Sequence, residues 1–381
     1  MIGHFLNLIF KGTSIYRWNN FSRIENISTI DNKGFTLQVA YILSKVIEEK
    51  EGIKLDILYI FKKIIFSSFE TLILSDINSD LQRRIINKNS GIYAKLVKKV
   101  QDFLTSQDIS GNIKDDILYI YKNENNPKYA REHEIMEFSK LWVAYYEAYF
   151  SAKIYPEMYE DVLNNIKDRL DNTKYSTLLK YLNINNTSND LEKFLLNIRR
   201  LQSNFRWNRM KRIYPISVMA HSYITFFLAY IAGKTEDYND EKILDIMTRA
   251  LFHDVPESIT GDIVSPTKKA VPGFAELLGD IELEMLEEYL FIHISGFDFK
   301  KDLAKIMLEP FSGEDGKIVK MCDIFSSLFE SKLEVQNSEE FSKIYIDTKR
   351  KLRAYNTKSS NYILNYGVDY FEDNMEEIVK L

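Results

Sequence analysis

Cysteine and the residues that break helices are scarce in this chain of 381 residues. It has only 14 glycines and 7 prolines, which together make up about half of their share in an average protein. So few breakers favour long helices and argue against sandwiches or barrels built from short strands. The single cysteine, Cys322, excludes an intrachain disulfide framework and a cysteine-rich zinc module. It also fits a reducing cytoplasm.

Long apolar runs and a surplus of one charge are also missing. No window approaches the roughly 18 consecutive apolar residues of a membrane-spanning helix. Residues 1–10 are mostly apolar but lack the basic region and cleavage site of a signal peptide, so we expect them to start a buried helix. The net charge of −5 is well mixed along the chain, which argues against a broad basic surface for duplex nucleic acid or an anionic membrane. We expect a soluble, cytoplasmic protein.

An internal repeat is the most informative feature that the chain does contain. Residues 17–28 and 206–217 are identical at seven of twelve positions, where unrelated segments would share about one. Two further blocks follow in the same order, and they pair 66–77 with 252–263 and 135–143 with 318–326. This order predicts two copies of one domain, in residues 1–182 and 194–381, joined by a polar linker over residues 183–193.

Apolar residues recur at helical spacing within each copy. In the second copy this spacing predicts helices over residues 217–232, 241–254, 275–291, 317–334 and 338–356. The first of them is apolar almost all round, which indicates a buried helix. Because no run alternates as a strand does, we predict an all-α fold made of two tandem helical bundles.

Two histidines and two aspartates of the second copy are candidates for a metal site. His253 and Asp254 end the 241–254 helix on the side of its apolar stripe, and His221 lies on the buried helix before it. With Asp323 they form a mixed nitrogen and oxygen set suited to one divalent ion such as Mn or Co. On the residues alone, an interior histidine is also commonly a hydrogen-bonded core residue. Asp323 lies off the main stripe of its helix and could be solvated.

The order of these residues resembles the HD-domain phosphohydrolases. The run from Phe252 to Asp262, preceded by Arg206-Trp207 and His221 and followed by Lys320 to Asp323, is similar to the 5′-deoxynucleotidase branch of that superfamily. The resemblance covers residues 194–345. It implies a helical, metal-dependent enzyme that removes phosphate from deoxyribonucleoside 5′-monophosphates.

The resemblance also implies a role for each motif residue. It makes His221, His253, Asp254 and Asp323 the metal ligands. Glu257 would orient or deprotonate the attacking water as general base, and Asp262 would lie near the nucleophile and the sugar. The substrate-binding residues would be Arg206 on the phosphate, Trp207 against the deoxyribose, and Asp262 and Ser265 in the nucleotide pocket. One departure is that Val218 to Ala220 lack the glutamate that often precedes the first histidine, which leaves the sugar preference open.

The first copy lacks every proposed ligand. The block offsets replace His221 by Asn32, the His253-Asp254 pair by Ser67-Ser68, Asp323 by Lys140 and Glu257 by Thr71. We therefore expect no metal in the first copy, and an intramolecular pseudo-dimer in which it supplies the partner surface. Arg17-Trp18 persists there, either as a structural pair in both copies, which we favour, or because the first copy still binds a nucleotide.

Two other functions remain open at this point. A related phosphohydrolase acting on a deoxynucleoside triphosphate, an alarmone or a cyclic nucleotide would need the same metal-activated water. A non-catalytic protein that senses nucleotides or acts as a scaffold is the alternative from another class. A further homo-oligomer is also compatible with the sequence.

Overall fold

The computed structural model describes residues 2–75, 77–185, 188–261, 263, 267 and 271–375. Within these residues the chain forms helices, short helical turns and loops but no β-strand, which confirms the all-α prediction. Two isolated antiparallel bridges occur, and they join Tyr16 to Ser28 and Phe205 to Ser217. No helix in the described part of the chain is both long and apolar enough to cross a membrane.

The N-terminal half contains the first eight helices. Their bounds are α1 Ile2–Gly12, α2 Thr29–Glu51, α3 Ile57–Ile73, α4 Ser79–Ser106, α5 Gly111–Lys122, α6 Ala130–Ala152, α7 Pro156–Leu170 and α8 Ser176–Leu179. The expected buried N-terminal helix is confirmed, because α1 has almost all of its residues buried.

The C-terminal half begins at α9. Its helices are α9 Asp190–Arg199, α10 Val218–Thr235, α11 Asp240–Phe252, α12 Glu257–Thr260, α14 Phe274–Tyr289, α15 Lys300–Leu308, α16 Gly313–Glu334, α17 Glu339–Tyr355, α18 Lys358–Ile363 and α19 Asp369–Asn374. Short helical turns lie at 127–129, 173–175, 200–202, 291–294 and 364–368. The five helices predicted for this half are present. Helix α9 begins at Asp190, within the predicted linker 183–193, and Asn189 caps it.

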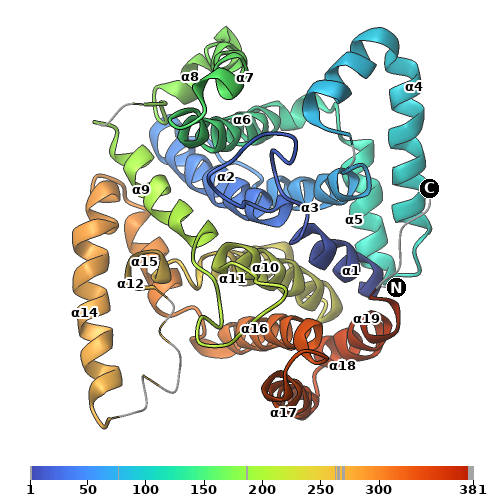
Figure 1. Ribbon diagram of the computed structural model, residues 1–381, viewed down its shortest axis with the longest axis vertical. Helices are drawn as coiled ribbons and strands as arrows, with labels where there is room; N and C mark the ends of the chain where they lie inside the picture. The colour runs from blue at the N-terminus through green and yellow to red at the C-terminus, as the bar shows by residue number, and fades with distance from the viewer. Residues whose placement is uncertain are drawn as a thin grey trace.

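The two halves meet along α2 and α10 (Figure 1). In this view the N-terminal half fills the upper part of the molecule and the C-terminal half the lower part. Helices α1 and α19, from opposite ends of the chain, pack together at the right-hand side. One hydrophobic core runs through both halves. Helices α2 and α10 are buried along most of their length, and Gly34 brings α2 close to the backbone oxygen of Met219 on α10.

Residue Asp31 of the first half reaches the start of the helix that carries His221. Its carboxylate accepts hydrogen bonds from the Ser28 backbone N–H and from the Ser217 hydroxyl. Ser217 in turn caps α10 by accepting from the backbone N–H of Ala220. Burial raises the pKa of Asp31 to about 6. A first-half carboxylate is therefore part of the N-terminal cap of α10.

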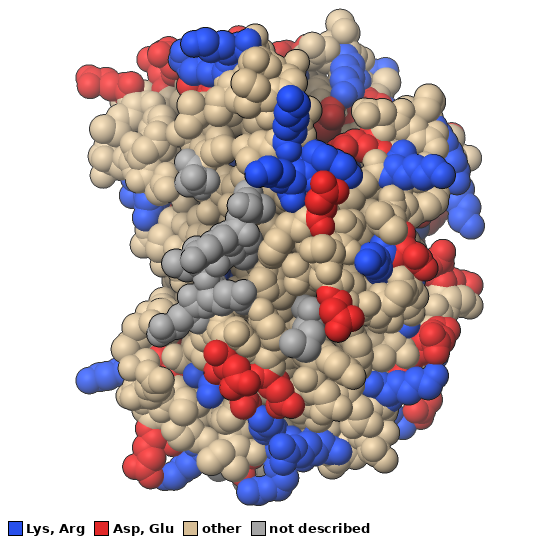
Figure 2. Space-filling model, turned by 90° about the vertical axis from the view of Figure 1, so that its right-hand side faces the viewer, with Lys and Arg blue, Asp and Glu red and all other residues tan. Residues whose placement is uncertain are grey.

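The face seen in Figure 2 carries Lys and Arg side chains interspersed with Asp and Glu. This agrees with the mixed charge pattern of the sequence.

Candidate metal centre

Helix α10 holds His221 in the interior. The ring is fully buried, and its two nitrogens face different groups. Nδ1 lies 2.8 Å from Ser326 Oγ and 2.9 Å from Glu330 Oε1. Nε2 lies 3.1 Å from Asp323 Oδ1 and 3.3 Å from Nε2 of His253. The ring thus bridges a buried glutamate and the other predicted ligands.

His253 and Asp254 follow the end of α11 instead of lying on it. The predicted helix over 241–254 is two residues too long, because α11 ends at Phe252. Pro256 explains this end, since it lacks the N–H that would donate to the Phe252 carbonyl in a continuing helix. The chain turns instead, and Nδ1 of His253 donates to the Ala250 carbonyl over 2.8 Å. Asp254 Oδ2 lies 3.1 Å from Nε2 of His253.

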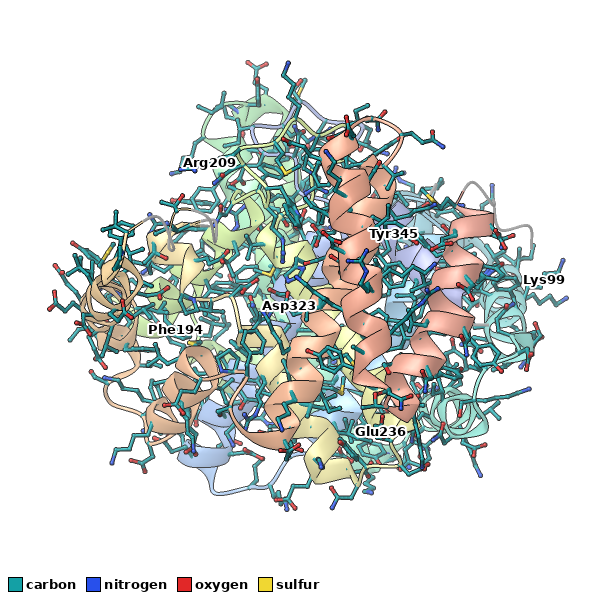
Figure 3. All side chains as sticks on the ribbon, turned by 90° about the horizontal axis from the view of Figure 1, so that it is seen from below. Lys99, Phe194, Arg209, Glu236, Asp323 and Tyr345 are labelled. Carbon is teal, nitrogen blue, oxygen red and sulfur yellow. The ribbon has the colours of Figure 1, made fainter. Side chains whose placement is uncertain are left out.

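Helix α16 brings Asp323 to the same place. Figure 3 shows Asp323 near the centre of the molecule, while Arg209 lies at its periphery. The Asp323 side chain is 13% exposed, and its Oδ2 accepts from Nζ of Lys320 over 2.7 Å. The alternative of a solvated Asp323 is therefore wrong. Donor atoms of His221, His253 and Asp254 lie within 4.8 Å of one another, and Asp323 contacts His221.

The chemistry of this donor set fits a cation. Nδ1 of His253 faces a carbonyl oxygen and Nδ1 of His221 faces a carboxylate, so both Nδ1 atoms carry a proton. In neutral rings both Nε2 atoms then present lone pairs toward each other and toward two carboxylates. Such a set is repulsive unless a further proton on one ring or a metal cation lies between its members. Two imidazole nitrogens with two carboxylates suit a borderline divalent ion.

The pKa values of the cluster show how strongly its charges interact. Burial alone would raise the pKa of Asp254, but His253, His221 and Arg206 outweigh burial and lower it to about 2. Burial also opposes ionisation of Asp323, yet a hydrogen bond from a protonated His221, the charge of that ring and the charge of Lys320 hold its pKa well below the ordinary value. The pKa of His221 is raised, because its bonds to Asp323 and Glu330 overcome burial and the nearby Arg206. Both carboxylates are therefore ionised at neutral pH.

A cavity of about 400 Å³ opens beside His253 and Asp254. Glu257, the first residue of α12, lines it with them. Its other lining is mainly apolar and comes from α14, α15 and the loop before α16, including Leu278, Ile281, Met285, Met307 and Phe311. The cavity thus has a charged end at the donor cluster and an apolar wall opposite.

Arg206 and Trp207 lie at the edge of the donor cluster. Arg206 is 3.8 Å from Asp254 Oδ2 and 3.6 Å from Glu330 Oε2, and its NH2 group donates to Ser327 Oγ over 3.2 Å. Trp207 has a left-handed backbone with φ of 59°, which is uncommon for a residue other than glycine. Its indole N–H donates to Glu330 Oε2 over 3.2 Å. The predicted substrate roles of this pair stay predictions, and Asp262 and Ser265 lie outside the described residues.

Sequence reasoning missed Glu330 and Phe311. Glu330 is fully buried on α16 and contacts His221, Arg206 and Trp207. Its counterpart at the 183-residue offset of the third repeat block is Glu147. The recurrence of a glutamate at this position in both copies is the sequence feature that could have indicated it. Phe311 packs edge-on against His253 with ring centroids 5.9 Å apart. No sequence pattern indicated this contact, because it depends on how the loop before α16 folds back.

The N-terminal half repeats the surroundings of this centre without its ligands. Trp18 also has a left-handed backbone with φ of 55°. Arg17 Nε and Trp18 Nε1 donate to Glu147 Oε2 over 3.2 and 3.0 Å. Asn32, at the position of His221, donates to Glu147 Oε1 over 2.8 Å. The Arg-Trp pair therefore makes the same glutamate contacts where no metal ligands remain, which supports a structural role in both halves.

The positions that correspond to His253 and Asp254 are on an unbroken helix. Helix α3 continues through Ser67 and Ser68 to Ile73, and both serine hydroxyls donate to the Ile64 carbonyl of their own helix. A buried lysine, Lys33, extends to Thr71 with an Nζ to Oγ1 distance of 3.4 Å. Burial lowers the pKa of Lys33 to about 7, with the charges of Lys140 and Arg17 acting in the same direction. Cations thus occupy the surroundings in which a metal would need anionic ligands.

Part of the chain is similar to known proteins. Residues 193–371 match the model of a family described as YfbR-like 5′-deoxynucleotidase. The chain is 26% identical over 193 residues to a 5′-deoxynucleotidase of Vibrio parahaemolyticus, a match that covers 49% of this chain and 97% of that protein. A 5′-deoxynucleotidase of Pasteurella multocida is 23% identical over the same length, with 49% and 98% covered.

Two solved structures are also similar to part of the chain. An HD-domain phosphohydrolase from Listeria innocua is 24% identical with a TM-score of 0.42, and the match covers 49% of this chain and 91% of that one. The HD phosphohydrolase DatZ of cyanophage S-2L, solved with dA and one catalytic Zn²⁺ ion, is 19% identical with a TM-score of 0.36. That match covers 47% of this chain and 96% of the other.

The buried Lys33 gives a prediction for folding stability. Its pKa is about 7 in the folded protein against an ordinary value of 10.5, so the unfolded chain holds more protons between these two pH values. Stability of the wild type must then rise relative to Lys33→Met across this window, by up to about 1.4 kcal/mol per pH unit, and stay level below pH 7. Urea unfolding of both proteins at several pH values measures this difference. Lys99→Met, at an exposed position of α4, is the control and should show no such slope. A pH-independent difference for Lys33→Met would contradict the assignment.

Proposed function

We propose that this protein is a metal-dependent 5′-deoxynucleotidase, a proposal supported by the match of residues 193–371 to the YfbR-like 5′-deoxynucleotidase model. It would release phosphate from deoxyribonucleoside 5′-monophosphates. The observation that carries the proposal is the convergence of His221, His253, Asp254 and Asp323, two of which line a cavity together with Glu257. A hydrolase for a phosphate ester needs this combination of a metal site, a base and an open space.

His221, His253, Asp254 and Asp323 would hold one divalent ion, such as Mn or Co. When bound, the ion supplies a water of lowered pKa and positive charge for a phosphoryl oxygen. The protein residues do the rest. Glu257 lines the cavity beside the ligands, where its carboxylate can orient the water and accept its proton. Arg206 is half-buried and already lies 3.8 Å from Asp254, so its guanidinium can bind a phosphate at the rim of the centre.

The rest of the cavity fits the nucleoside. Its apolar wall of Leu278, Ile281, Met285 and Phe311 suits the faces of a base. The proposed contact of Trp207 with the deoxyribose rests on the resemblance. In the structure the Trp207 ring packs edge-on against Phe341, with centroids 5.6 Å apart, and this contact fixes where the ring lies.

The N-terminal half is proposed to be a degenerate copy of the same domain. The bridges, the left-handed tryptophans and the glutamate contacts recur at the repeat offsets. We propose a first domain over residues 1–182 and a catalytic domain over residues 194–381, with a linker over residues 183–193 that contains the first turn of α9. The halves would form a pseudo-dimer, supported by the Asp31 to Ser217 bond and by Gln38, whose amide donates to the Leu251 carbonyl.

The same observations favour a 5′-deoxynucleotidase over the two alternative functions. A triphosphate, alarmone or cyclic nucleotide would use the same metal centre, but the Vibrio and Pasteurella relatives are 5′-deoxynucleotidases. A purely sensing or scaffold role leaves the gathered ligand set without a purpose. The cytoplasmic location and a further homo-oligomer remain predictions.

The catalytic proposal predicts opposite results for matched variants in the two halves. His253→Ala should lower the rate of phosphate release more than about 100-fold, because even a group behind a metal ligand typically contributes 10- to 100-fold. Ser67→Ala, at the corresponding position of the first half, should leave the rate within about twofold of wild type. The assay is phosphate release from ribo- and deoxynucleoside monophosphates with Mn, Co or Mg, with and without a chelator. Full activity of His253→Ala, or full activity in chelator, would remove the proposed mechanism.

The pseudo-dimer predicts that residues 190–381 alone are impaired. Removing the first half uncovers the face of α10 that packs on α2 and deletes Asp31 from the cap of α10. We expect this fragment to self-associate or to lose activity. Size-exclusion chromatography together with the phosphate assay measures both. A monomeric, fully active fragment would overturn the pseudo-dimer.

A further inference from the structure

Glu330 is the buried centre of the contacts behind the metal ligands. It lies on α16 seven residues after Asp323, two helical turns along, so that both side chains face the same neighbour. Its side chain is completely buried. A carboxylate in the interior is destabilising unless hydrogen bonds or cations compensate its charge. The identity of the groups that do so indicates what Glu330 is for.

The two carboxylate oxygens serve different parts of the site. Oε1 lies 2.9 Å from Nδ1 of His221. Oε2 accepts the indole N–H of Trp207 at 3.2 Å and lies 3.6 Å from Nε of Arg206 and 3.6 Å from NH1 of Arg212. One oxygen therefore holds the ring of a metal ligand, and the other holds the turn that carries the phosphate-binding arginine.

The contact with Oε1 fixes which nitrogen of His221 faces the metal. Because an ionised carboxylate only accepts, Nδ1 carries the proton and Nε2 is left with its lone pair toward Asp323, Asp254 and His253. A flipped ring would point the proton-bearing nitrogen at these groups. Carboxylates behind a ligating histidine commonly set its tautomer and its orientation in this way.

The first half separates the two functions of this glutamate. Glu147 divides its oxygens in the same manner, with Arg17 and Trp18 on Oε2 and Asn32 on Oε1. The hold on the Arg-Trp turn therefore persists without any metal ligand. Only in the second half does Oε1 contact an imidazole, that of His221. The contact between Glu330 and His221 is therefore the one that can serve a metal site.

We propose that Glu330 is a positioning residue that orients His221 for metal binding and joins this ligand to the Arg206-Trp207 turn. The proposal deepens the proposed function and rests on it for the use of the metal. What it predicts is the affinity of the protein for the metal, and this affinity does not depend on which nucleotide is the substrate.

The test compares Glu330→Gln with Glu147→Gln in the full-length protein. The amide introduced by Glu330→Gln keeps the size of the side chain but places an NH₂ donor where two acceptor oxygens are needed. Titration with Co²⁺ against a competing chelator dye should show affinity reduced about 10- to 100-fold for Glu330→Gln. Glu147→Gln should lower the melting temperature but bind Co²⁺ as the wild type does. Melting curves without metal measure the structural effect of each variant.

A second variant keeps the proposal testable if Glu330→Gln does not fold. Ser326 Oγ also contacts Nδ1 of His221, at 2.8 Å, so Ser326→Ala should weaken Co²⁺ binding by a smaller factor. Unchanged Co²⁺ affinity in Glu330→Gln, or an equal loss in Glu147→Gln, would overturn the proposal. If wild type binds Co²⁺ but releases no phosphate, the proposed function fails while the role of Glu330 is still decided by the affinities.

Discussion

The compensation of buried charge is the constraint on which this structure depends. Four groups that carry or share charge, His221, His253, Asp254 and Asp323, meet between helices whose other residues are largely apolar. Ionised carboxylates in such a place are stable only when cations or proton donors surround them. Arg206 and the two imidazoles supply part of this compensation, and a divalent ion would supply the rest. The N-terminal half shows what remains when the ligands are replaced, because Glu147 is still satisfied by Arg17, Trp18 and Asn32.

The difference between the halves follows from a few local features. Pro256 ends α11 and turns His253 and Asp254 toward α10, whereas Glu70 at the corresponding position has an N–H and lies within α3, which continues to Ile73. One helix break therefore separates a ligand-bearing turn from an ordinary helix. Asp31 adds an asymmetry in the other direction, since its counterpart in the second half is Ala220. Asp31 of the first half contacts Ser217 at the cap of α10. Ala220 has no carboxylate with which to make the equivalent contact at the cap of α2.

Much of this could be predicted from the sequence, for physical reasons that differ by residue. Apolar spacing predicted the helices because the core buries one stripe of each, or the whole circumference of α10. The candidate ligands could be singled out because a histidine and an aspartate on a buried stripe are costly and therefore informative. The end of α11 was placed two residues too late, since periodicity continues past Phe252 and only the missing N–H of Pro256 stops the helix. Glu330 was missed because its role depends on contacts with residues that are distant in the sequence. Lys33 was missed because the burial of a lysine depends on how α2 packs.

The account places one metal centre in the second half and none in the first. The most direct test is an anomalous-difference map of crystals grown with Co²⁺. The account predicts a single strong peak per chain, bounded by Nε2 of His221, Nε2 of His253 and the carboxylates of Asp254 and Asp323. No peak should lie between Asn32, Ser67 and Lys140. A peak in the first half, or none beside His221 at saturating Co²⁺, would contradict it.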